Sequence, residues 1–84
     1  MRTKKNPTLG EQVQAAVGLA FARLGGEPFV SVASRSGLSL ATIYRLWWGL
    51  ASEHTHAGTI IRLGEVAGLK FTLADNAIYA ELMG

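Results

Sequence analysis

The sequence predicts one small all-α domain, a bundle of four to five helices with a short β-strand near the carboxyl end. Apolar residues recur every three or four positions along most of the chain, glycines separate these runs, and one stretch alternates instead. Of the 84 residues, 49% are apolar and 17% are charged, which suits a single core and is too apolar for a disordered chain. Cysteine is missing, which excludes disulfides, thiolate catalysis and cysteine zinc sites.

The first helix begins after Thr8 and ends at Gly25. Thr8 and Glu11 have the spacing of a capping box, in which each side chain satisfies the other's free backbone amide. Glycine ends helices in the left-handed conformation, and Pro28 cannot continue one. The apolar residues of this run share one helix face: Leu9, Val13, Val17, Ala20, Phe21 and Leu24.

Two shorter helices are expected next. The first spans residues 29–36, with Val32 and Ala33 inward, and Gly37 breaks it. Ser39 is a good N-cap for the second, which ends before Gly49. Its inward residues at helical spacing are Ile43, Leu46 and Trp47.

The residue pattern after Gly49 predicts a helix, a strand and a last helix. The fourth helix runs from residue 55 or 56 to Ala67 and closes at Gly68. Residues 69–73 alternate as a half-exposed strand does, and this strand needs a partner within the chain or in a second copy. Asp75 is expected to cap a fifth helix over residues 77–82.

Residues 29–48 have the pattern of a helix-turn-helix motif. Ala33 is small where two helices would cross, and Gly37 can take the positive φ of the turn. The wedge between the helices is filled by Leu38, Ile43 and Leu46.

These residues closely resemble the lambda-repressor-like family of helix-turn-helix regulators, which includes phage repressors, Cro proteins and bacterial xenobiotic-response-element regulators. The run Ala33…Gly37-Leu38-Ser39…Ile43-Tyr44-Arg45-Leu46…Gly49 matches the family's signature, and residues 59–69 look like its following helix. The resemblance covers residues 9–73. Together with the charges of the first residues and the unpaired strand, it divides the chain into a basic arm (1–7), a DNA-binding domain (8–68) and a carboxyl-terminal strand and helix expected to form the dimer (69–84).

The resemblance implies that the second helix of the motif lies in the major groove of DNA. Carried over by position, its DNA-facing residues are Ser39, Leu40, Ala41, Thr42, Tyr44 and Arg45. Arg45 is the leading candidate for base recognition, because a guanidinium bonds both O6 and N7 of guanine; a salt bridge or phosphate clamp is the alternative. Basic side chains of the arm either follow the duplex or only solubilise the chain: Arg2, Lys4 and Lys5.

Two departures from the family pattern affect this interface. Pro28 and Phe29 stand where the family often has a polar pair that contacts phosphate. Trp47 and Trp48 replace acidic and polar residues. We expect one tryptophan in the core and the other exposed as a partner surface or partly covered by the fourth helix.

Charge is distributed unevenly along the chain. Residues 1–50 hold six basic and two acidic side chains, whereas the remaining 34 hold two basic and four acidic ones. This asymmetry is typical of a chain that meets a polyanion at one end, and random scatter explains it equally well.

Other functional classes find little support. His54 and His56 have the spacing of two metal ligands, but no carboxylate cluster completes a site, so we expect neither a metal nor a cofactor. No catalytic motif is present, which argues against an enzyme. The longest uncharged stretch, residues 12–22, is shorter than the ~20 apolar residues of a membrane span, and a bacterial or phage-infected cytoplasm is the expected location.

The sequence therefore predicts a sequence-specific DNA-binding transcriptional regulator, Cro-like or repressor-like, that binds a two-fold symmetric operator as a homodimer. The expected dimer contacts are Leu69, Phe71, Leu73, Ile78 and Leu82. Two alternatives remain open. One is a helix-turn-helix antitoxin whose carboxyl segment also holds a toxin; the other is a helical adaptor that binds only protein, with Trp47 and Trp48 as its anchor. A regulator would act by excluding polymerase from DNA or by contacting it.

Overall fold

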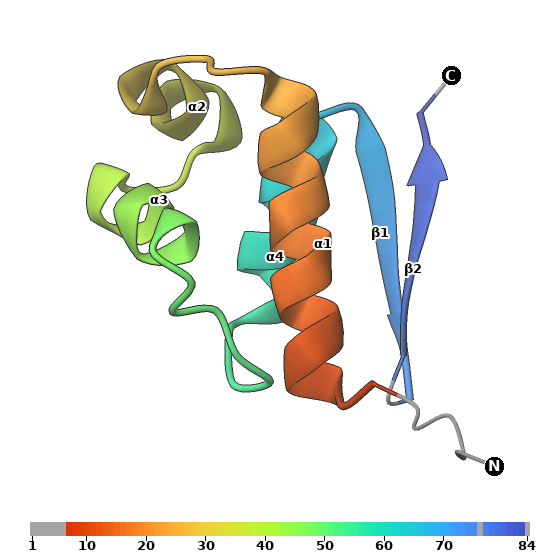
Figure 1. The fold of residues 1–84 in the computed structure, drawn as a ribbon. Coiled ribbons are helices and arrows are strands. Elements are labelled where there is room, and N and C mark those ends of the chain that lie inside the picture. The colour runs from red at the N-terminus through yellow and green to blue at the C-terminus, as the bar shows by residue number, and fades with distance from the viewer. Residues whose placement is uncertain (1–6, 76, 84) are drawn as a thin grey trace, which may run out of the picture.

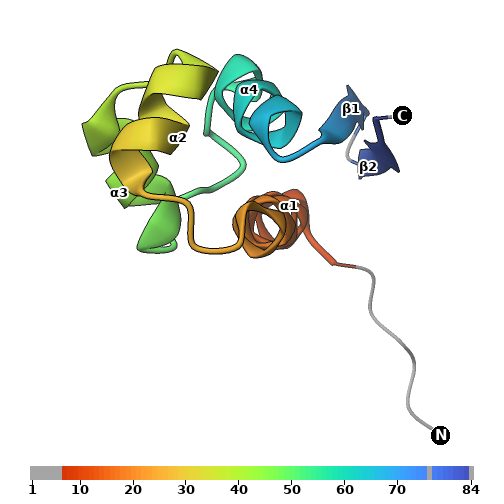
Figure 2. The same ribbon diagram turned by 90° about the horizontal axis from the view of Figure 1, so that it is seen from above.

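The computed structural model describes residues 7–75 and 77–83, so the basic side chains Arg2, Lys4 and Lys5 lie outside the described part. Helices α1 and α4 lie side by side between the α2–α3 pair and a β-hairpin (Figures 1 and 2). The elements in chain order are α1 (Leu9–Leu24), α2 (Phe29–Ser36), α3 (Leu40–Trp47), α4 (Ala57–Val66), β1 (Leu69–Ala74) and β2 (Ala77–Leu82).

Local signals place the ends of α1 where they were predicted. The Thr8 hydroxyl accepts a hydrogen bond from Glu11 N at 3.1 Å, and Thr8 N donates to the Glu11 carboxylate at 2.8 Å. The bond from Thr8 N, and after it the nearby Thr8 hydroxyl, lowers the pKa of Glu11 because both groups favour the charged carboxylate. At the other end Gly25 has a φ of 61°, the left-handed conformation that ends the helix.

One core joins the inner faces of all the elements. Ile43, Ile60 and Leu63 are fully buried at its centre, as the helical spacing predicts. Ala33 and Leu38 are only half-buried and pack at the edge of this core. The wedge between α2 and α3 is therefore filled mainly from α3.

The expected fifth helix is wrong, because residues 77–82 form strand β2. This strand pairs antiparallel with β1, so that Leu69 lies opposite Leu82 and Ala74 lies opposite Ala77. Asp75 takes a φ of 53° in the connecting turn, a conformation that Asp tolerates, and caps no helix. Six residues are too few to form a stable helix alone, whereas pairing satisfies the backbone of β1 along one edge. The predicted strand thus has its partner within the chain.

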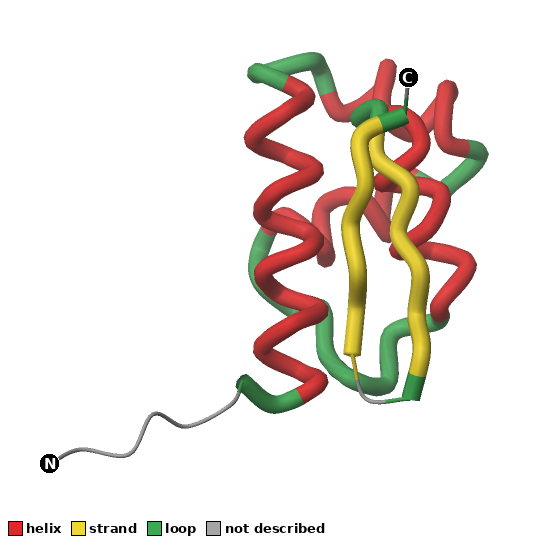
Figure 3. The backbone as a smooth tube through the Cα atoms, turned by 90° about the vertical axis from the view of Figure 1, so that its right-hand side faces the viewer, coloured by secondary structure: helices red, strands yellow, loops and turns green. Residues whose placement is uncertain are grey.

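The hairpin covers one side of the α1–α4 pair. β1 lies on the side of α4 and β2 on the side of α1 (Figure 3). Leu69 and Phe71 are buried in the chain's own core, so these two expected dimer contacts are not available to a second copy. Ile78 is half-buried, and Leu73 and Leu82 are exposed.

Among the described residues, every helix is too short or too polar to cross a lipid bilayer.

Candidate nucleic-acid interface

The turn between α2 and α3 is fixed by hydrogen bonds. Gly37 has a φ of 75°, and its N–H donates to the Ala33 carbonyl at 3.0 Å. The Ser36 hydroxyl accepts from Leu38 N at 3.2 Å. Ser39 then caps α3, because its Oγ accepts from Thr42 N at 3.1 Å. The direction in which α3 leaves the turn is therefore set by short-range contacts.

Helix α3 has one buried side and one exposed side. Ile43 and Leu46 point into the core. The candidate DNA contacts on the other side are exposed, namely Leu40, Ala41, Tyr44 and Arg45. Ser39 is also exposed, but its hydroxyl lies 2.8 Å from that of Thr42, so these two groups already bond to each other. The exposed side of α3 thus carries the side chains that the family resemblance predicts to contact DNA.

A hollow of about 260 Å³ lies beside Arg45, between α3 and the start of α4. His54 and His56 line it from the α3–α4 loop. Three hydroxyl groups complete its polar lining, from Thr42, Thr55 and Thr59. No carboxylate is among the described residues that line this hollow, which suits an anionic ligand.

Arg62 adds a second cation to the same side of the molecule. It lines a smaller hollow of about 170 Å³ together with His56 and Thr59, which also line the first. Its guanidinium approaches Gly37 in the α2–α3 turn. No local pattern predicts that Arg62 joins this side, since it lies seventeen positions after Arg45 and on another helix.

His56 has a structural role at the start of α4. Its Nδ1 accepts a hydrogen bond from Gly58 N at 3.1 Å and so caps the helix. His54 is exposed, with its Nε2 3.8 Å from a Glu53 carboxylate oxygen. In the described part of the chain no three potential metal-ligating side chains come together.

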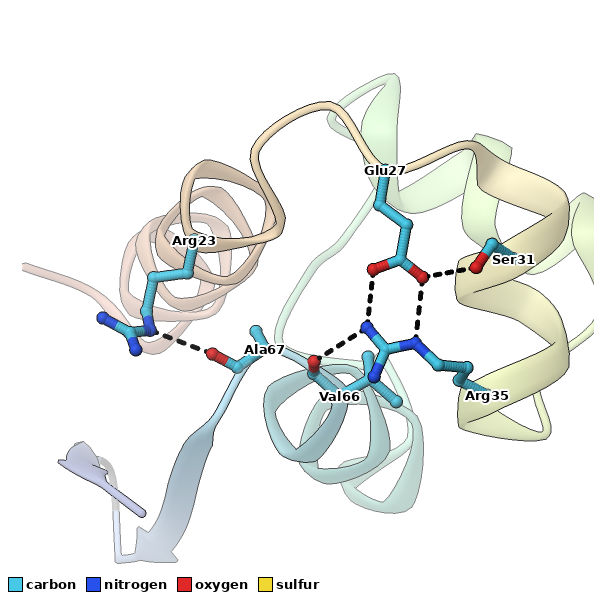
Figure 4. Close-up of polar contacts among 6 residues, drawn as sticks. All are labelled: Arg23, Glu27, Ser31, Arg35, Val66 and Ala67. Atoms are coloured by element: carbon cyan, nitrogen blue, oxygen red, sulfur yellow. Dashed lines mark hydrogen bonds and ion pairs between the residues drawn. The ribbon is translucent and has the colours of Figure 1, made fainter. Parts of the chain in front are cut away.

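Two other arginines are engaged in holding the fold together (Figure 4). Arg35 bonds Glu27 at 2.6 and 2.9 Å and also donates to the Val66 carbonyl at 3.1 Å. Arg23 donates to the Ala67 carbonyl at 2.9 Å. Both guanidinium groups thus approach the carboxyl-terminal end of α4, where the helix dipole favours positive charge.

The same contacts shift the pKa values of the ion pair. The Arg35 guanidinium and the Ser31 hydroxyl lower the pKa of Glu27 to about 2, and Glu27 in turn raises the pKa of Arg35. Arg35 is therefore partly neutralised, unlike Arg45, for which the structure shows no ion pair with a described residue.

Neither tryptophan enters the core, which corrects the expectation that one would. Trp47 is 55% exposed and Trp48 is 72% exposed. The Trp47 ring rests against Phe21 and Phe29, with centroids 5.3 and 5.4 Å away. The Tyr44 ring also packs edge-on against Phe29, at 5.1 Å.

A physical reason for this exposure lies in α1. Gly18 and Ala22 line a hollow of about 380 Å³ together with Trp47, and a glycine without a side chain and an alanine methyl group are too small to cover an indole ring. A second hollow of about 380 Å³ is lined by Trp47 together with Phe29 and Pro28. Trp47 thus borders two hollows with mostly apolar linings.

The chain was compared with protein-family models, with curated proteins and with solved structures, and none of the three comparisons gave a match.

Proposed function

We propose that the chain is a sequence-specific DNA-binding transcriptional regulator of the lambda-repressor-like type, and that it places α3 in the major groove. The observation that carries this proposal is the position of Arg45. It lies on the exposed side of α3, next to a hollow lined by two histidines and free of carboxylates among the described residues. An α-helix fits the major groove, and an arginine there can bond a guanine with two hydrogen bonds.

Each part of the exposed side has its own role in this proposal. Arg45 reads a guanine, and the apolar side chains of Leu40 and Ala41 contact thymine methyl groups. Tyr44 presents its hydroxyl to the backbone while its ring stays against Phe29. Leu40 and Ala41 discriminate bases weakly, so Arg45 carries most of the sequence preference.

Phosphate contacts supply the remaining affinity. Arg62 and the hydroxyls of Thr55 and Thr59 lie on the same side as Arg45, around the start of α4. The first amides of a helix and nearby cations are common phosphate ligands in protein–DNA complexes. Such contacts fix the orientation of α3 without reading sequence.

One recognition helix of eight residues makes few contacts, so we propose that two copies bind together. Two copies related by a two-fold axis read a symmetric operator whose half-sites lie about 34 Å apart or a multiple of that distance. Regulation then follows from occupancy, which excludes polymerase or brings it into contact with the protein.

A selection experiment tests the proposal. Immobilised full-length chain is mixed with a pool of random duplexes, and the retained fragments are sequenced over several rounds. We expect a short two-fold symmetric site to be enriched. Binding to that site should weaken steeply with salt, with a slope of about −0.9 for each phosphate neutralised. A pool that stays unenriched, with no duplex binding at low salt, would contradict DNA binding.

A second candidate function is supported by the two exposed tryptophans. Trp47 and Trp48 form an aromatic surface of the kind that is enriched in protein interfaces. A protein-binding adaptor would use this surface and would show no affinity for duplex DNA at any salt concentration. In an adaptor, Trp48→Ala would abolish capture of the partner protein and Arg45→Ala would not. In a DNA-binding regulator, Arg45→Ala would weaken duplex binding and Trp48→Ala would not.

A further inference from the structure

Strand β2 has one edge that is not paired with β1. In an antiparallel pair, alternate residues direct their backbone groups toward the partner strand. Met83 N donates to the Gly68 carbonyl at 2.9 Å, so the odd-numbered residues of β2 face β1. The backbone groups of the even-numbered residues face away from it: Ile78, Ala80 and Leu82.

Only part of this edge is covered. Ile78 N donates to the Gln12 side chain of α1 at 3.0 Å, which agrees with the outward direction of the even-numbered residues. For Ala80 and Leu82, the structure shows no hydrogen bond at this edge with any described residue. The edge of β1, in contrast, lies close to α4, where the Leu69 carbonyl is 3.2 Å from the position of a Cβ on Gly64.

The edge also lacks the features that prevent strands from pairing with other chains. Native edge strands are commonly protected by lysine, proline or a bulge. β2 contains no lysine and no proline, its register with β1 has no bulge, and its one charged residue is Glu81. The chemistry of this edge therefore fits another extended strand.

Apolar surface lies next to the open edge. Leu82 is 69% exposed, and Leu19 on α1 is 44% exposed. Between α1 and β2 there is a hollow of about 210 Å³, lined by apolar side chains that include Ala15, Leu19, Ile78 and Ala80. A strand placed beside β2 would direct every second side chain toward the face of the sheet that borders this hollow.

We propose that the occupant is a second copy of the chain, whose β2 pairs antiparallel with this edge around a two-fold axis at Ala80. The strand is self-complementary in this register, as an interface with two-fold symmetry requires. Ile78 lies opposite Leu82 of the second copy, and both face the helices. In this pair the Leu82 carbonyl of the second copy replaces the Gln12 side chain as the acceptor for Ile78 N. Tyr79 lies opposite Glu81 of the second copy on the other face, where the phenol hydroxyl can donate to the carboxylate.

Charge selects this register over the neighbouring one. Glu81 already has Lys70 opposite it on β1. A shift that moves the two-fold axis to Glu81 would place the two Glu81 carboxylates opposite each other, which is unfavourable. The dimer thus forms through the outer edge of β2, and the β1 residues Leu69 and Phe71 stay in the core of each copy.

The β2 interface would hold together the two copies that are proposed to bind one operator. Only this role in DNA binding rests on the proposed function, because the dimer itself can be tested without DNA. Sedimentation velocity of the full chain without DNA tests it. We expect a species of twice 9.0 kDa at micromolar concentrations and above. Leu82→Lys should give a folded monomer by sedimentation and circular dichroism. The matched control Leu50→Lys changes a leucine that is 62% exposed in the α3–α4 loop and should remain a dimer.

A cross-link tests the register. The chain has no cysteine of its own, and residues facing each other in a hydrogen-bonded antiparallel pair have Cα atoms about 5.5 Å apart, within disulfide range. Ala80→Cys should therefore form a disulfide dimer on mild oxidation, much faster than the exposed control Ala41→Cys. A wild-type monomer at every concentration, or equal cross-linking of the two variants, would overturn the inference.

Failure of this inference and failure of the proposed function are distinguishable. A monomer that still binds a selected half-site contradicts only the β2 interface. A dimer without affinity for any duplex contradicts only DNA binding.

Discussion

Gly64 of α4 and Phe71 of β1 are in such close contact that a Cβ on Gly64 would lie 2.5 Å from the Phe71 ring. Both residues are buried, and the Leu69 carbonyl is also near. The absence of a side chain at Gly64 allows β1 to pack directly on α4. This close packing explains why a glycine stands in the middle of α4, although glycine is a poor helix former.

Gly64→Ala should therefore destabilise the chain although alanine is the better helix former. Overpacking of this kind lowers the free energy of unfolding by about 1–3 kcal/mol, measured by urea denaturation. Gly18→Ala is the matched control, since Gly18 is also helical and has no neighbouring atom within 4 Å of the new methyl group. It should raise the free energy of unfolding by about 0.5–1 kcal/mol. Equal effects of the two substitutions would disprove the close contact.

The pair Glu27–Arg35 makes stability depend on pH in the acid range. The pKa of Glu27 in the folded chain is lowered from 4.5 to about 2 by Arg35 and Ser31. A lowered pKa stabilises the folded state above pH 4.5, and this contribution is lost as the pH falls from 4.5 toward 2. The melting temperature of Glu27→Gln should lie below that of the wild type near neutral pH, and the difference should close toward pH 2. Glu65→Gln, on the exposed side of α4, is the control, and a gap independent of pH would refute the role of Glu27.

Ser39 offers a way to separate folding from DNA binding. Ser39→Asp keeps a good N-cap for α3 and adds a negative charge to the side of α3 that is proposed to face DNA. Stability in urea should stay within about 0.5 kcal/mol. Affinity for the selected duplex should fall on the order of tenfold, since like charges about 4 Å apart repel by roughly 1–4 kcal/mol in aqueous or surface environments. Ser39→Asn caps the helix without the charge and should retain more affinity; the same affinity for both variants would place Ser39 away from the phosphates.

Arg45 and Lys5 should differ in how they affect specificity. Arg45→Ala should cost about 1–3 kcal/mol on the selected site and little on a scrambled one, since the guanidinium is proposed to read a base. Lys5→Ala should weaken both duplexes to a similar degree if, as the sequence suggests, the basic arm follows the duplex through phosphate contacts. Titrations of both variants on both duplexes at one salt concentration make the comparison. If the two variants behave alike, Arg45 does not read a base.

Much of the helical part of the fold could be predicted from the sequence, because its signals are local. The capping box of Thr8 and Glu11, the cap at Ser39 and the positive φ of Gly37 each depend on residues within four positions. The apolar spacing of α1, α3 and α4 then placed Ile43, Ile60 and Leu63 in the core.

The errors occurred where distant residues decide the outcome. The segment 77–82 contains alanine, glutamate and leucine, all good helix formers, and only its pairing with β1 makes it a strand. The exposure of Trp47 depends on Gly18 and Ala22 in α1, more than twenty positions away. The grouping of Arg45 with Arg62 and two histidines needs the α3–α4 packing, which no local pattern encodes.

Nuclear magnetic resonance offers the most direct test of whether the exposed side of α3 meets DNA. Backbone amide signals of the full chain are followed while the selected duplex is added. The protein concentration is kept constant, so that the oligomeric state of the protein does not change during the titration. Residues 39–45 and 54–59 should show the largest shifts, and β1 and β2 should change little. Shifts confined to the hairpin or to the Trp47–Trp48 surface, with none along α3, would contradict the central claim.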